Sequence, residues 1–162
     1  MRRLALLLPL VLLVGCGGSS KAVQSTTTTQ AAPPGPGKVL YAGGPWAVVV
    51  DRTKATAFHR VGGVWRPDRS HAVTIRVLGP QPGSKAPRLP QVAAELRGNA
   101  PLVESGLWVD GKELFEKGGG LSPTSGSIYG APTAGLAPGR HVAVAYARTD
   151  AHAAAIAWVF RV

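Results

Sequence analysis

The feature that most constrains the fold is a series of short alternating or β-branched runs that extends from about residue 38 to residue 162. Gly, Pro, Asn and Asp separate these runs, and no long stretch has the 3.6-residue period of an amphipathic helix. Short runs between turn-forming residues are typical of β-strands. The segment holds roughly 125 residues, enough for one domain with a hydrophobic core. We therefore expect an all-β domain.

The strands can be placed from the alternation and from the turn residues. The predicted strands are residues 46–50, 55–61, 64–66, 73–78, 91–96, 105–109, 112–115, 126–129, 141–148 and 154–162. Gly62-Gly63 and Asp110-Gly111 each join two runs, which indicates a two-residue hairpin turn. In the last run, Ile156, Trp158 and Phe160 alternate with small or basic residues and are expected to face the core. Trp46 and Trp108 are also expected there.

Several stretches resemble bacterial immunoglobulin-like and fibronectin-type-III-like sandwich domains. Residues 136–144, LAPGRHVAV, are similar to the family's Leu-x-Pro-Gly-x-His/Tyr entry into the penultimate strand, and residues 148–162 resemble its closing turn and strand. Residues 73–84 resemble the first strand, and residues 104–111 resemble the strand with a core tryptophan. The resemblance implies a turn at Pro138-Gly139. It also implies that the side chain of His141 bonds back to the backbone at that corner.

The predicted fold is an immunoglobulin-like antiparallel β-sandwich over residues 71–162, the part that the resemblance covers. Residues 38–70 have no counterpart in a minimal sandwich. We predict that they form an extra N-terminal β-meander packed on the sandwich. From the sequence alone, these strands either extend one sheet or form an appended unit.

Residues 1–15 have the organisation of a signal peptide. Arg2 and Arg3 supply a positive start, and residues 4–14 form an apolar run interrupted only by Pro9. This run is too short to span a bilayer, which takes roughly 20 residues.

Residues 13–16, LVGC, resemble the bacterial lipobox, and Cys16 is the only cysteine of the chain. The resemblance implies that Leu13, Val14 and Gly15 are recognised, that the thiol of Cys16 takes a lipid, and that the chain is cut before it. Each buried methylene of an acyl chain adds about 0.8 kcal/mol of membrane affinity. The alternatives are an ordinary secretory signal and an uncleaved anchor.

The segment that follows Cys16 is predicted to be a disordered spacer, residues 16–37. Small, polar and Pro/Gly residues dominate it, so it cannot bury enough apolar surface to offset the entropy of ordering. It would tether the domain of residues 38–162 to a membrane.

The chain is strongly basic. Its formal charge is +10, and without Arg2 and Arg3 it is +8, with 16 basic against 8 acidic residues. Outside the cytoplasm nucleic acid is not the expected partner, whereas anionic lipids and wall polymers attract such a surface. Trp65, Arg66 and Arg69 form a candidate polymer-binding or sugar-stacking patch. The alternatives are a solvated basic surface and ordinary packing at a strand end.

The sequence offers little for catalysis or metal binding. The four histidines, His59, His71, His141 and His152, fall in different predicted elements. Only His141 and His152 are expected to approach each other, across the final hairpin. The chain has no Gly-x-Ser-x-Gly or Ser-x-x-Lys motif. We therefore predict no catalytic residues, no metal and no cofactor.

These features predict a lipoprotein on the extracytoplasmic face of the cell membrane, acting as a non-enzymatic binding or scaffolding module. Its expected partners are the membrane, through the lipid anchor, and an envelope protein. The alternative is a binder of anionic wall polymer or glycan. A metal carrier or enzyme of the envelope is the less favoured alternative.

Overall fold

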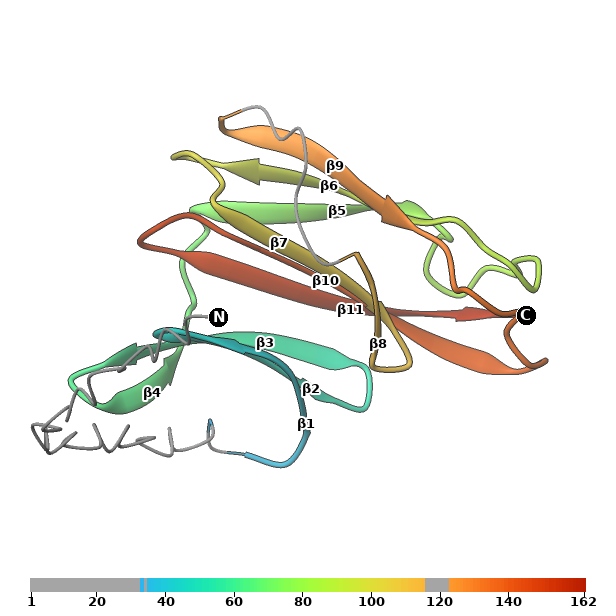
Figure 1. Ribbon diagram of the computed structural model, residues 1–162, viewed down its shortest axis with the longest axis horizontal. Helices are drawn as coiled ribbons and strands as arrows, with labels where there is room; N and C mark the ends of the chain where they lie inside the picture. The colour runs from blue at the N-terminus through green and yellow to red at the C-terminus, as the bar shows by residue number, and fades with distance from the viewer. Residues whose placement is uncertain (1–32, 34, 116–122) are drawn as a thin grey trace, which may run out of the picture. The chain divides into compact units, whose positions relative to one another are not determined.

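Strands joined by turns and loops make up the part of the chain that the computed structural model describes, which is Pro33, residues 35–115 and residues 123–162. The first four strands form one antiparallel sheet in chain order, here called the meander (Figure 1). They are β1 (Lys38–Gly43), β2 (Trp46–Asp51), β3 (Lys54–Val61) and β4 (Val64–Pro67). The predicted N-terminal meander is thus confirmed. In these described residues no helix is long and apolar enough to cross a membrane.

The remaining strands form two further antiparallel sheets. The outer sheet has the order β5-β6-β9, from β5 (Val73–Gly79), β6 (Val92–Gly98) and β9 (Ser125–Gly130). The central sheet has the order β11-β10-β7-β8, from β7 (Glu104–Val109), β8 (Lys112–Phe115), β10 (Arg140–Arg148) and β11 (Ala153–Arg161). This arrangement confirms the all-β antiparallel sandwich over the C-terminal part of the chain.

One hydrophobic core fills the space between the outer and central sheets. Leu96 and Ile128 contribute to it from the outer sheet, and Leu107, Trp158 and Phe160 contribute from the central sheet. The alternation in β11 therefore predicted the correct buried face, because Trp158 and Phe160 belong to this core and Ile156 packs against it.

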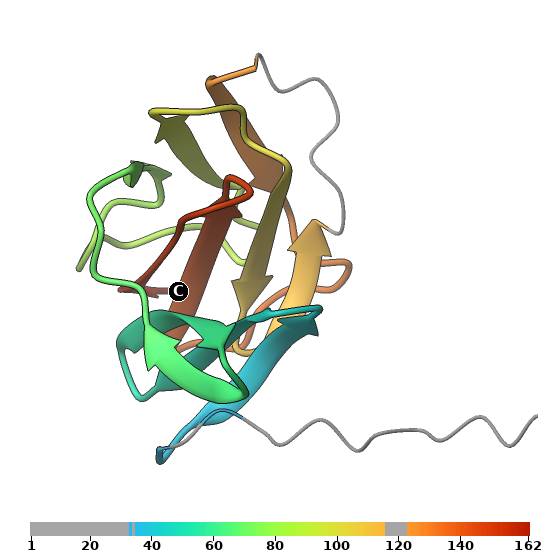
Figure 2. The ribbon, with the colours of Figure 1, turned by 90° about the vertical axis from the view of Figure 1, so that its left-hand side faces the viewer.

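A second core lies on the opposite face of the central sheet. Trp46 and Val48 of the meander pack there with Trp108, Val144 and Tyr146. The central sheet is therefore covered on both faces, and Figures 1 and 2 show it between the meander and the outer sheet. This explains why both faces of β10 carry apolar side chains, since a sheet buried on two sides needs a nearly continuous hydrophobic run.

Two hairpin turns follow the sequence signals directly. Gly62 and Gly63 both have positive φ angles, 58° and 82°, and join β3 to β4. Asp110 and Gly111, at 51° and 75°, join β7 to β8. Positive φ at both central residues is the geometry of the type I′ turn, whose twist matches that of the flanking strands.

The sequence did not predict β1 as a strand. The stretch KVLYAG is short, has glycine at its end and only partly buried side chains, so it carries no strong strand signal. The signal peptide of residues 1–15, the lipobox residues Leu13, Val14, Gly15 and Cys16, and most of the spacer lie outside the described residues.

Candidate functional site

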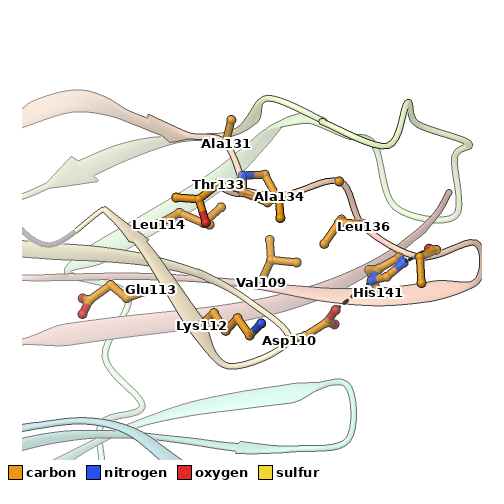
Figure 3. Close-up of a pocket in the computed structure, with 13 residues that line it drawn as sticks. Val109, Asp110, Lys112, Glu113, Leu114, Ala131, Thr133, Ala134, Leu136 and His141 are labelled. Atoms are coloured by element: carbon orange, nitrogen blue, oxygen red, sulfur yellow. Dashed lines mark hydrogen bonds and ion pairs between the residues drawn. The ribbon is translucent and has the colours of Figure 1, made fainter.

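A small pocket lies at the end of the sandwich beside the β7–β8 hairpin. Its volume is about 390 Å³, within the size range of small-molecule sites. The hairpin lines one side, and residues 131–137 of the loop between β9 and β10 line the other (Figure 3). Val109, Leu114 and Leu136 supply apolar walls, while Lys112 and Glu113 add charge. We call this hollow the hairpin pocket.

His141 forms one end of the hairpin pocket and holds the corner that the resemblance implied. Its Nε2 lies 2.8 Å from the carbonyl oxygen of Ala137, four residues earlier. Between them Gly139 has a φ of 142°, a conformation that side-chain-bearing residues rarely adopt. The imidazole is nearly buried and lies against the ring of Phe160, with 5.7 Å between ring centroids. The expected bond from His141 back to the backbone is present.

Asp110 connects this corner to the β7–β8 turn. Its Oδ2 lies 2.7 Å from Nδ1 of His141, and its Oδ1 accepts a 2.9 Å hydrogen bond from the backbone N–H of Val142. The backbone N–H of Asp110 donates to the carbonyl oxygen of Val142 at 2.9 Å. From the sequence, Asp110 was expected only as a residue of the hairpin turn. Its bonds to β10 depend on the pairing of β7 with β10, which no local motif reveals.

The protonated form of His141 fits this environment best. Both ring nitrogens face oxygen acceptors, so two N–H groups are needed to satisfy them. Burial lowers the pKa of His141, but the hydrogen bonds to Asp110 and to the Ala137 carbonyl outweigh it and raise the pKa above its ordinary value. In this state neither nitrogen has a lone pair for a metal or a substrate proton, so the pair acts as a structural clamp.

The histidine pair considered for metal binding does not form. His141 is the second residue of β10 and lies opposite Phe160, whereas His152 lies in the turn after β10, at the other end of the same strand. His152 instead faces Asp68, with 3.5 Å between Nδ1 and Oδ2. Across the described part of the chain, no three His, Cys, Asp or Glu side chains are grouped so that they could hold a metal ion.

The patch of Trp65, Arg66 and Arg69 is only partly available as a surface. Trp65 is 8% exposed, and the guanidinium of Arg60 lies 5.8 Å from the centroid of its ring. The ring is therefore packed, which agrees with the alternative of ordinary packing at a strand end and leaves little of it open for stacking on a sugar. Arg66 and Arg69 are exposed.

A polar network that the sequence did not indicate connects the meander to the central sheet. The hydroxyl of Tyr41 donates to Oε1 of Glu104 at 2.6 Å, and Nε of Arg148 donates to Oε2 of the same carboxylate at 2.5 Å. Burial and the bond to Glu104 raise the pKa of Tyr41 to about 12. The residues come from β1, β7 and β10, so only the fold brings them together.

A second hollow lies at the end of β11 and is strongly basic. Its volume is about 750 Å³, and Lys85, Arg140 and Arg161 line it together with Gly83, Val159 and Val162. No sequence motif marks these three cations as a group, because they come from three separate segments.

No protein-family model, curated protein or solved structure matches this chain.

Proposed function

We propose that the protein is a lipid-anchored component of the bacterial cell envelope, exposed on the extracytoplasmic face of the membrane, and that its β-domain is a non-enzymatic binding or scaffolding module. The immunoglobulin-like character of the sandwich is part of this proposal. The observation that carries it is the sequence LVGC at residues 13–16, which places the only cysteine directly behind a short apolar run.

The geometry of the hairpin pocket supports binding rather than catalysis. The imidazole of His141 and the carboxylate of Asp110 are both engaged in bonds that hold the fold. A general base or nucleophile needs a side chain that can reach a substrate, and these two groups are already committed to each other and to the backbone. The pocket retains apolar walls and two charged residues, Lys112 and Glu113, which suits a small protruding side chain of a partner.

A matched pair of substitutions tests the binding role. Ala134→Trp fills the hairpin pocket, whereas Ala151→Trp adds the same side chain at an exposed position of the β10–β11 turn. Cross-linked membranes would be extracted, and proteins bound to each variant identified by mass spectrometry. We expect Ala134→Trp to reduce recovery of a specific envelope protein about tenfold or more, as loss of a central contact does. Equal recovery from both variants would contradict a role for the pocket, and no specific partner with the native chain would contradict the scaffolding function.

The second candidate function is binding of an anionic wall polymer. The basic hollow at the end of β11 favours it, since three cations line one concave surface.

A further inference from the structure

We propose that Lys85, Arg140 and Arg161 bind the phosphodiester groups of an anionic polymer. We call these three residues the cation row. The inference rests on the proposed function for where the ligand is met, but the binding itself can be measured without that assumption.

The backbone fixes the cation row across three neighbouring segments. Arg140 and Arg161 are direct partners in the register of β10 and β11, and Lys85 forms an isolated parallel bridge with Arg161. Two hydrogen bonds hold that bridge: the N–H of Ala86 donates to the carbonyl of Arg161 at 2.8 Å, and the N–H of Arg161 donates to the carbonyl of Ser84 at 2.9 Å. Direct cross-strand partners present their side chains on the same face of a sheet, so Arg140 and Arg161 lie together.

Like charges at directly opposed positions destabilise a sheet unless something compensates them. Other basic side chains are compensated within the protein: Arg76 and Arg97 both pair with Glu95, and Arg148 pairs with Glu104. None of the ion pairs among the described residues includes a member of the cation row. The row is exposed, and an anion from outside the domain would supply the missing compensation.

The shape and chemistry of the hollow favour a phosphate chain. A guanidinium presents paired N–H donors that match the oxygens of a phosphate, and an ammonium adds a further charge. The hollow is concave, with Gly83 and Val159 beside the charges, so a flexible chain can enter it more readily than a flat membrane surface can. Three cations on adjacent segments also suit successive phosphates of one polymer better than a single carboxylate.

The test compares two triple variants that lose the same charge. One is Lys85→Gln/Arg140→Gln/Arg161→Gln, and the control is Lys38→Gln/Arg52→Gln/Lys54→Gln, whose three exposed cations lie in the meander, away from both the hollow and the patch of Trp65, Arg66 and Arg69. Binding of fluorescently labelled poly(glycerol phosphate) to the detergent-extracted full chain would be measured by anisotropy. We expect the cation-row variant to bind at least about tenfold more weakly and the control to change less than about threefold. Circular dichroism would verify that both variants are folded.

Three results would overturn the proposal. An equal loss in both variants would mean that only net charge matters, and undetectable binding to the native chain would exclude the polymer. Displacement of the polymer by detergent micelles containing phosphatidylglycerol, at equal phosphate concentration, would assign the site to lipid headgroups instead. If the lipid-anchor proposal is wrong, the Cys16 thiol will carry no lipid, and the polymer-binding measurement will be unaffected. The two proposals can therefore fail independently.

Discussion

At the scale of single residues, the contact between Asp110 and His141 joins two segments that are 31 positions apart in the chain. The Pro-Gly-x-His run was sufficient to predict that His141 bonds to the backbone at its own corner, because that bond is local. Its bond to Asp110 was beyond prediction, since it depends on the register between β7 and β10. The sequence left two alternatives open for Trp65, because the side chain over its ring, Arg60, lies on the neighbouring strand.

The raised pKa of His141 makes stability depend on pH. A pKa that is higher in the folded than in the unfolded chain stabilises the fold fully below the unfolded value, about 6.5, and this contribution is lost as pH rises through the folded value. Urea unfolding from about pH 5.5 to 9 should therefore show a loss of stability with rising pH that His141→Gln largely removes. His71→Gln, at an exposed position, should retain the native pH dependence. If the stability of His141→Gln depends on pH in the same way as that of the native chain, the proposal that protonated His141 stabilises the fold is wrong.

Among the secondary-structure elements, alternation located the strands from β2 to β11. It did not predict how the three sheets stack on one another. The turn pairs Gly62-Gly63 and Asp110-Gly111 fixed two hairpins because their backbone requirements are local. β1 was missed because its position depends on pairing with β2 and on the bond from Tyr41 to Glu104, rather than on its own propensity. The apolar run in β10 is explained by burial on both faces, because the meander packs on the face opposite the outer sheet. The run alone did not reveal which element covers that second face.

Trp158 provides the most direct test of how β11 faces the core. Its side chain is 4% exposed, and its indole N–H donates to the carbonyl of Pro80 at 2.9 Å. Trp158→Ala should lower the free energy of unfolding by about 3–5 kcal/mol, because it removes a buried aromatic side chain and leaves a cavity. Tyr129→Ala, an aromatic truncation at a position 61% exposed, should cost less than about 1 kcal/mol. A loss below about 1 kcal/mol for Trp158→Ala in denaturant titrations would contradict the assigned facing.

At the scale of the whole molecule, the domain combines two cores, a structural histidine clamp and an excess of positive charge. The central sheet serves both cores, so the meander and the sandwich stabilise each other through shared strands. Arg76, Arg97 and Arg148 pair with carboxylates, whereas no ion pair within the described part of the chain includes a member of the cation row. A basic domain of this kind on a lipid tether would meet anionic polymers and headgroups at short range.

We propose that Cys16 anchors this domain to a membrane, and the mass of the membrane-extracted chain tests this proposal. The chain should lack residues 1–15 and begin at Cys16, with a mass increase that corresponds to diacylglycerol on its thiol. Cys16→Ala serves as the control, because it cannot take the lipid and should leave the membrane fraction. An unmodified Cys16 thiol, or a chain that still begins at Met1, would contradict the account.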